Sequence, residues 1–274
     1  RRCRYVDPRS VRQLAGVPRY PSGLCMLPGG VLVTTSYEPN NSNTGGETAV
    51  KFIAARNDSD PQVVAACQAS GLAARQFEFL MGLALANDGL LAYSYDGASA
   101  ALYKFAKNGS MDELATVPVL ADYDRGFKKL AVHQQTQRTY AIAGDADEGN
   151  LAVVLLDANL QVIATVETAG APEDFGEDEH YEPICDVAVH GDQVIVLSTN
   201  SHLKGSGLRL LDLDGRFLRT IAAGQFQNPQ AVTASQGRAF VVDADDYDGM
   251  TAESCIVVLH VVDIQSGDIL QSVP

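Results

Sequence analysis

Pairs of short apolar segments, each joined by a tight polar turn, recur along the whole chain. Two clear examples are residues 81–93 and 185–197, where Asn-Asp-Gly at 87–89 and Gly-Asp at 191–192 separate the apolar segments. Glycine, asparagine and aspartate tolerate the positive φ that tight hairpin turns need. Each pair therefore predicts a β-hairpin. The pattern occurs five times, at residues 22–33, 81–93, 129–142, 185–197 and 229–243.

Each of these hairpins is followed by a loop and a second hairpin. The clearest second hairpin covers residues 208–221, and several of these outer strands alternate apolar and polar residues. The unit is thus four strands in roughly 45 to 60 residues, and a four-stranded antiparallel unit repeated at this period is typical of a β-propeller blade. Neighbouring blades would cover both faces of the inner strands, which explains their continuous apolar character. The other second hairpins are expected at residues 50–66, 101–117, 151–166 and 256–273.

The first residues of the chain fit the same pattern. Residues 3–7 and 11–16 resemble the third and fourth strands of a blade, whereas residues 268–273 already form the last strand of the fifth blade. We therefore predict a single all-β domain over residues 1–274, a six-bladed propeller with half a blade outside this chain. The alternative is a closed five-bladed ring with the N-terminal strands as an extra layer. Since the chain begins at Arg1, we expect it to be part of a longer protein. The predicted boundaries are a half blade at 1–16 and blades at about 17–75, 76–124, 125–170, 171–223 and 224–274.

One blade resembles an NHL repeat. In residues 226–243 an aromatic residue, Phe226, leads through Pro229 to a small apolar strand, a turn, and a second strand that ends at Asp243. The outer hairpin at 212–218 fits the same repeat, and the resemblance covers about residues 184–243. It implies an NHL-type β-propeller, a fold that hosts ligases, lyases, receptors and scaffolds alike.

The net charge of −14 changes the picture of the partners. Nucleic acids and anionic membranes reward a positive surface, so this charge argues against both. No apolar run reaches the length of about 18 residues that a membrane helix needs, so we expect no membrane insertion by this segment. Basic proteins and metal cations remain compatible partners, as does a surface that is acidic only for solubility.

Carboxylates concentrate in three long loops, around residues 145–148, 173–179 and 243–248. In this blade pattern such loops fall on one face, which would carry an acidic rim. Calcium takes six to eight oxygen ligands from flexible loops, and the run 243–249 has the necessary ligand density without the alternation of an EF-hand loop. Two interpretations stay open: a calcium site and a solvated acidic surface. The candidate metal ligands are Asp243, Asp245, Asp246 and Asp248.

Catalysis is the alternative to binding. Calcium-dependent lactonases use six-bladed propellers in which Glu, Asn and Asp converge at the central channel, and the candidates here would be Glu182, Asn228 and Asp243. Glu182 and Asn228, however, each precede a proline, as residues at the start of a strand do. His133 and His190 occupy equivalent turn positions, and no nucleophile motif is present. We therefore favour a non-catalytic binding or scaffold propeller with protein partners in a larger assembly, and keep a calcium-dependent hydrolase as the alternative.

Three glycosylation motifs favour an extracellular or secretory-pathway protein. They begin at Asn40, Asn57 and Asn108, all in expected turns or loops. The alternative is that asparagine, glycine and serine favour turns in any case. The five cysteines do not decide the compartment, because an odd number leaves at least one thiol outside any disulfide. Cys25 and Cys185 lie in apolar stretches and are expected to be buried.

Overall fold

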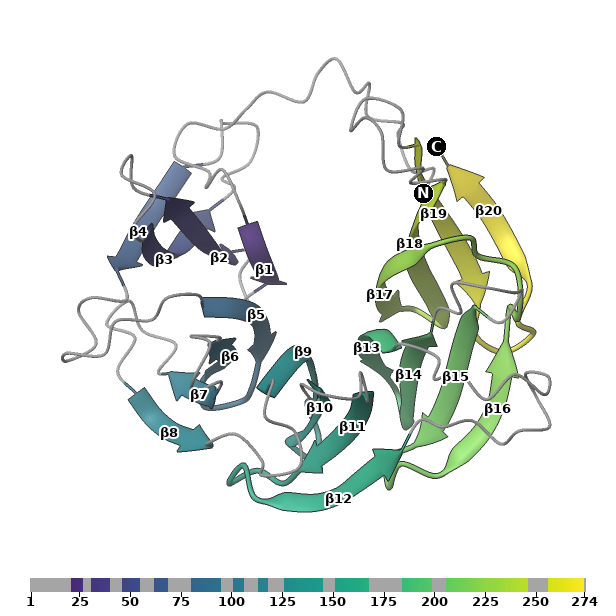
Figure 1. Ribbon diagram of the computed structural model, residues 1–274, viewed down its shortest axis with the longest axis horizontal. Helices are drawn as coiled ribbons and strands as arrows, with labels where there is room; N and C mark the ends of the chain where they lie inside the picture. Colours follow the sequence, from purple (N-terminus) through teal and green to yellow (C-terminus); the bar gives the residue numbers. More distant parts are fainter. Residues whose placement is uncertain are drawn as a thin grey trace.

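Five four-stranded sheets surround a common centre (Figure 1). The computed structural model describes residues 21–26, 31–39, 46–54, 62–68, 80–94, 101–105, 113–117, 126–144, 151–167, 184–198, 206–245 and 256–273. In each sheet the strands follow one another in chain order and pair antiparallel. The prediction of an all-β propeller with four-stranded antiparallel blades is therefore confirmed, whereas the number of blades in the complete ring stays a prediction.

We number the five sheets as blades 1 to 5 along the chain. The first strand of each blade lies nearest the centre and the fourth strand lies at the outside (Figure 1). Within the described ranges, no helix has the length and apolar character to cross a bilayer. Blade 1 contains β1 (Pro21–Met26), β2 (Val31–Pro39), β3 (Gly46–Ala54) and β4 (Gln62–Gln68); blade 2 contains β5 (Leu80–Leu85), β6 (Leu90–Ser94), β7 (Ala101–Phe105) and β8 (Glu113–Val117); blade 3 contains β9 (Gly126–His133), β10 (Arg138–Gly144), β11 (Leu151–Leu156) and β12 (Val162–Glu167); blade 4 contains β13 (Ile184–His190), β14 (Gln193–Ser198), β15 (Gly207–Asp212) and β16 (Phe217–Ile221); blade 5 contains β17 (Pro229–Ser235), β18 (Arg238–Asp245), β19 (Ile256–Asp263) and β20 (Ile269–Val273).

The hydrophobic core lies between the blades. Blade 4 contributes Ile195 and Leu197 from β14 to its contact with blade 5, where they meet Val241 and Val262. All four side chains are fully buried. Separate clusters fill the contacts of blade 2 with blade 3 and of blade 3 with blade 4. Because both faces of a middle strand meet a neighbouring blade, consecutive residues of β10 and β14 are apolar and buried.

Every blade also carries two irregularities at matching positions. The pairing of the first strand with the second shifts register, as at Lys128 in β9, Cys185 in β13 and Gln230 in β17. The third and fourth strands shift register as well, whereas the second and third pair regularly. A β-bulge bends a strand and redirects the side chain that follows it. The residues after these bulges, Lys129, Asp186 and Ala231, face the centre of the ring.

An aspartate closes the turn between the third and fourth strands in blades 3, 4 and 5. In blade 4 the Oδ1 atom of Asp212 accepts hydrogen bonds from the amides of Asp214 and Arg216, both at 2.9 Å. An aspartate that binds nearby amides in this way stabilises a turn without help from other blades. The same turn follows Asp157, which accepts hydrogen bonds from the amides of Asn159 and Gln161. The turn after Asp263 is one residue longer, and there the carboxylate accepts from the amides of Gln265 and Ser266.

A cationic side chain of the preceding blade binds each of these turns, and we call this contact the turn latch. In every case the acceptor is the carbonyl oxygen of the residue directly after the turn aspartate. Arg138 of blade 3 also forms an ion pair with Asp214, with 2.7 Å between Nη1 and Oδ1. The three latches are Lys104 to Ala158 at 3.4 Å, Arg138 to Leu213 at 2.8 Å, and Arg219 to Ile264 at 2.8 Å.

Candidate functional site

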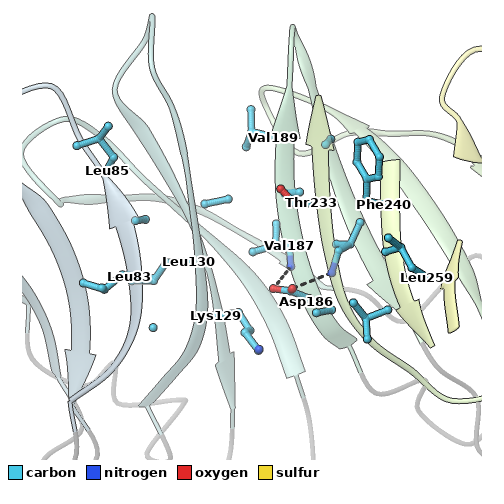
Figure 2. Close-up of a pocket in the computed structure, with 18 residues that line it drawn as sticks. Leu83, Leu85, Lys129, Leu130, Asp186, Val187, Val189, Thr233, Phe240 and Leu259 are labelled. Atoms are coloured by element: carbon cyan, nitrogen blue, oxygen red, sulfur yellow. Dashed lines mark hydrogen bonds between the residues drawn. The ribbon is translucent and has the colours of Figure 1, made fainter. Parts of the chain in front are cut away.

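A cavity of about 680 Å³ lies at the centre of the ring. Its wall comes from the first strands of blades 2 to 5, namely β5, β9, β13 and β17, and it continues over part of β18 and β19. Most of the side chains on this wall are apolar, among them Leu83, Leu130 and Val187 (Figure 2). Volumes of this order and apolar walls with a few polar groups are typical of ligand sites.

Asp186 is the acidic residue on this wall. Its Oδ1 atom accepts a hydrogen bond from the amide of Val187, and its Oδ2 atom accepts one from the amide of Val232 in blade 5, both at 2.9 Å (Figure 2). Burial raises the pKa of Asp186 above its ordinary value, whereas Lys129 and the two amides oppose this shift. The carboxylate thus joins blades 4 and 5 at the wall of the cavity.

Lys129 is the basic residue on the wall, and it comes from the neighbouring strand β9 (Figure 2). It follows the bulge of its strand and pairs with Ile142, as Asp186 follows the bulge at Cys185 and pairs with Leu197. The two charges therefore occupy equivalent positions of adjacent blades. Such a pair in an apolar channel can fix the orientation of a bound group that carries both polar and apolar parts.

Asp243 does not line the cavity. Its side chain, which is 4% exposed, lies at the far end of β18 and accepts hydrogen bonds from the amides of Gln227 at 2.9 Å and Asn228 at 2.7 Å. These amides belong to the turn that precedes β17. Asn228 lies in that turn, also away from the wall, and its side-chain oxygen accepts a hydrogen bond from Gln230. The structure therefore does not bring these two residues together at the channel, and Glu182 lies outside the described residues.

His260 and Ser272 extend this arrangement to the outer strand, and the sequence analysis did not identify them. The Nε2 atom of His260 lies 3.3 Å from Oδ2 of Asp243, and its Nδ1 atom lies 2.8 Å from Oγ of Ser272. Its ring packs against Phe226 with the centroids 5.5 Å apart. A hairpin register that places His260 between Val241 and Ser272 could have indicated the contact with Ser272.

Cys185, at the bulge before Asp186, is half-buried. Burial raises the pKa of its thiol to about 11, with a further contribution from the negative charge of Asp186. Since a thiolate is the reactive form of cysteine, this environment keeps the thiol protonated and unreactive at neutral pH.

Most of the acidic loops lie outside the described residues. This applies to Asp246 and Asp248 of the predicted calcium site and to the acidic residues of 145–148 and 173–179, and nothing is described of the Asp245 side chain. Among the residues whose positions are described, no group of three histidine, cysteine, aspartate or glutamate side chains could hold a metal ion. The calcium site thus stays a prediction, which a thermal melt with calcium and with a chelator would test. The glycosylation candidates Asn40, Asn57 and Asn108 also lie outside the described part.

Comparison with known proteins supports the fold alone. No protein-family model matches the sequence, and no curated protein matches it as a relative. Among solved structures, the chain is similar to one in a nidogen/laminin complex, with a TM-score of 0.57 and 11% identity over 92% of this chain and 79% of the other. It also resembles Kuenenia stuttgartiensis hydrazine synthase, with a TM-score of 0.55 and 14% identity over 96% of this chain and 67% of the other. A third similar structure is the Dos1 propeller, with a TM-score of 0.51 and 13% identity over 92% of this chain and 57% of the other. These similarities place the chain among β-propellers, and the NHL type stays a prediction.

Proposed function

We propose that this chain is a non-catalytic binding or scaffold propeller that acts within a larger extracellular assembly. The observation that carries the proposal is the central cavity, whose apolar wall bears Lys129 and Asp186 at equivalent positions of adjacent blades. A partner can place an apolar group in this cavity and orient it with polar contacts to these two charges. The similarity to a propeller solved in a nidogen/laminin complex supports a protein as that partner.

The binding role can be tested at Thr233, an exposed residue of β17 on the cavity wall. Thr233→Arg places a long charged side chain in the cavity without disturbing the contacts between blades. Thr165→Arg, at an exposed position of the outer strand β12, is the matched control. We expect Thr233→Arg to abolish co-purification of protein partners from the native source and Thr165→Arg to leave it unchanged. Equal retention of partners by both variants would contradict binding through the cavity.

The complete ring, in this proposal, has six NHL-type blades. Three observations support it: the five similar sheets, the matching bulges, and the strand-like sequence pattern of residues 3–16. Limited proteolysis of the longer protein followed by mass measurement would test it, since a resistant fragment should extend beyond residues 1–274 by about the length of two strands, or some 20 residues.

The extracellular placement is supported by the glycosylation motifs at Asn40, Asn57 and Asn108. Mass measurement of peptides from the native protein, with and without glycosidase, tests it directly. A glycan on at least one of these asparagines is expected, and unmodified peptides at all three would oppose the placement.

A further inference from the structure

Three polar side chains on one face of blade 5 lie in a row that leads from the interior to the surface. They come from three adjacent strands: Asp243 from β18, His260 from β19 and Ser272 from β20. The register pairs His260 with Val241 on one side and with Ser272 on the other, and Asp243 lies two residues beyond Val241. Since side chains two residues apart in a strand share a face, this register brings the three together.

The two inner members of this row are buried and held in place. The side chain of Asp243 is 5% exposed and that of His260 is 12% exposed, whereas Ser272 is exposed. Two backbone amides of the turn before β17 hold the carboxylate of Asp243, and the ring of Phe226 packs against the imidazole. The serine hydroxyl is therefore the member of the row that an external molecule can reach.

The contacts of the imidazole determine which nitrogen carries its proton. Nε2 of His260 lies 3.3 Å from Oδ2 of Asp243, and Nδ1 lies 2.8 Å from Oγ of Ser272. A neutral imidazole has one N–H group, and a neighbouring carboxylate favours the proton on the nitrogen that faces it. Nδ1 then accepts a hydrogen bond from the hydroxyl of Ser272. A hydroxyl that is hydrogen-bonded to a base, with the base oriented by a third group, is the arrangement that activates serine for acyl transfer.

We propose that Ser272 is a nucleophilic serine that accepts an acyl group from a small neutral ester. Its Oγ atom attacks the carbonyl carbon of the ester, and the new C–O bond replaces the bond to the leaving alcohol. The hydroxyl proton passes to Nδ1 of His260 and from there to the leaving oxygen, so the products are an acylated serine and an alcohol. Each serine reacts once, and this modification site is therefore compatible with the non-catalytic binding role proposed for the cavity.

The surroundings of Ser272 favour an ester that is neutral and apolar. Its strand, Ile269–Val273, has no charged residue, and Leu270 in this strand is 51% exposed. The net charge of −14 disfavours the approach of anionic acyl donors. Ser272 lies on the outermost strand of blade 5 and the central cavity is lined by other residues, so binding in the cavity and acylation of Ser272 can be tested independently.

Acetylation of the full chain by p-nitrophenyl acetate, located by peptide mass spectrometry, tests the proposal. Ser266, exposed in the turn before β20, is the internal control, because its hydroxyl oxygen contacts the amide of Asp268 at 3.2 Å instead of an imidazole. A positioned general base accelerates such a reaction by about 10²- to 10⁴-fold, so we expect Ser272 to be acetylated at least about 100-fold faster than Ser266. Equal rates at the two serines would overturn the proposal.

Variants of His260 separate activation from a structural role. His260→Gln removes the base and should lower the rate at Ser272 to that at Ser266. His190→Gln is the matched control and should leave both rates unchanged, because Nε2 of His190 accepts a hydrogen bond from the amide of Gly237 and contacts no serine in the described structure. Free imidazole should restore part of the rate at Ser272 in His260→Ala, which a structural role does not explain. Fast acetylation of Ser272 in folded His260→Gln would contradict the proposal. If the variant does not fold, the comparison of Ser272 with Ser266 in the wild type still decides the matter.

Discussion

The imidazole of His260 lies 3.3 Å from the carboxylate of Asp243, and both side chains are almost completely buried at the outer end of blade 5. The carboxylate also holds the amides of Gln227 and Asn228, so one side chain fixes the turn that leads into β17 and orients the ring of His260. A carboxylate so engaged is a structural element of blade 5.

Asp243→Asn should therefore destabilise the protein. One oxygen of the carboxylate becomes an amide NH₂ that cannot accept a hydrogen bond, which leaves a backbone amide without its acceptor and lowers the free energy of unfolding by about 2 kcal/mol. Urea denaturation would measure it. Asp192→Asn, at an exposed position of the turn between β13 and β14, is the control and should change stability by less than about 0.5 kcal/mol. Equal effects of the two variants would contradict this role of Asp243.

The contribution of Asp186 should depend on pH. Because burial raises its pKa above the ordinary value of 3.8, the folded protein binds more protons than the unfolded chain between the two values. Stability therefore falls as the pH rises through this window and is regained as the pH is lowered. The free energy of unfolding of the wild type, measured relative to non-titrating Asp186→Asn, should increase as the pH is lowered from neutral towards the ordinary pKa of 3.8. A difference that does not vary with pH would argue against the raised pKa.

The thiol of Cys185 should react slowly. With a pKa of about 11 instead of the ordinary 9.0, its thiolate fraction at pH 8 is about 100-fold lower than in the unfolded chain. The rate of alkylation by iodoacetamide should be lower in the native protein by at least that factor, and this rate should still rise with pH up to about pH 10. Lys129→Gln removes the charge that lowers this pKa and should slow the reaction further. A rate that levels off near pH 9 would show that the thiol is unperturbed.

Gly82 should not tolerate a side chain. It lies in the bulge of β5 with φ of +60°, and an added Cβ would collide with the ring of Tyr93. Gly82→Ala should cost about 3 kcal/mol, from the left-handed backbone and the collision together. Gly191 has a similar φ of +54° and open space around it, so Gly191→Ala isolates the backbone contribution of about 1 kcal/mol. Thermal denaturation of both variants makes the comparison, and equal costs would show that the ring of Tyr93 moves aside freely.

At the contact between blades 3 and 4, a buried hydrogen bond of Tyr140 should stabilise the fold more than the exposed ion pair between Arg138 and Asp214 does. The hydroxyl of Tyr140, a residue only 1% exposed, donates a hydrogen bond to the carbonyl oxygen of Leu213 at 2.9 Å, beside Arg138. Tyr140→Phe should lower the free energy of unfolding by about 1 kcal/mol. Asp214→Asn removes only the solvent-exposed ion pair with Arg138 and should cost less than about 0.5 kcal/mol. A larger loss for Asp214→Asn would show that the ion pair, and not the hydrogen bond to the carbonyl, dominates this contact.

The repeated hairpins could be predicted because burial between blades imposes a pattern on the sequence. Strands such as Gln193–Ser198 meet apolar neighbours on both faces and consist almost entirely of apolar residues. The turns between them are marked by residues such as Gly191, whose positive φ the sequence pattern implies. Fold class thus follows from local periodicity.

The candidate site could not be predicted in the same way, because it joins residues that are far apart in the sequence. Lys129 and Asp186 become neighbours only through the ring, and the bulges that direct them to the channel leave no clear mark on the sequence. The interpretation of Asp243 as a metal candidate followed carboxylate density. In the structure Asp243 pairs opposite Pro229, which places its carboxylate beside the amides of Gln227 and Asn228 in the turn before β17. The strand register therefore explains the hydrogen bonds of Asp243 better than the density of carboxylates in the sequence does.

The three turn latches share one direction, since the cation always belongs to the earlier blade and the carbonyl to the later one. Blades 2 to 5 are thus linked in order, each to the next, by contacts that do not depend on where the polypeptide starts. A circular permutant of this chain that joined residue 274 to residue 1 through a linker and opened a new pair of termini between blades 2 and 3 should keep all three latches. These contacts depend on which blade follows which around the ring, and not on the order of the blades along the polypeptide.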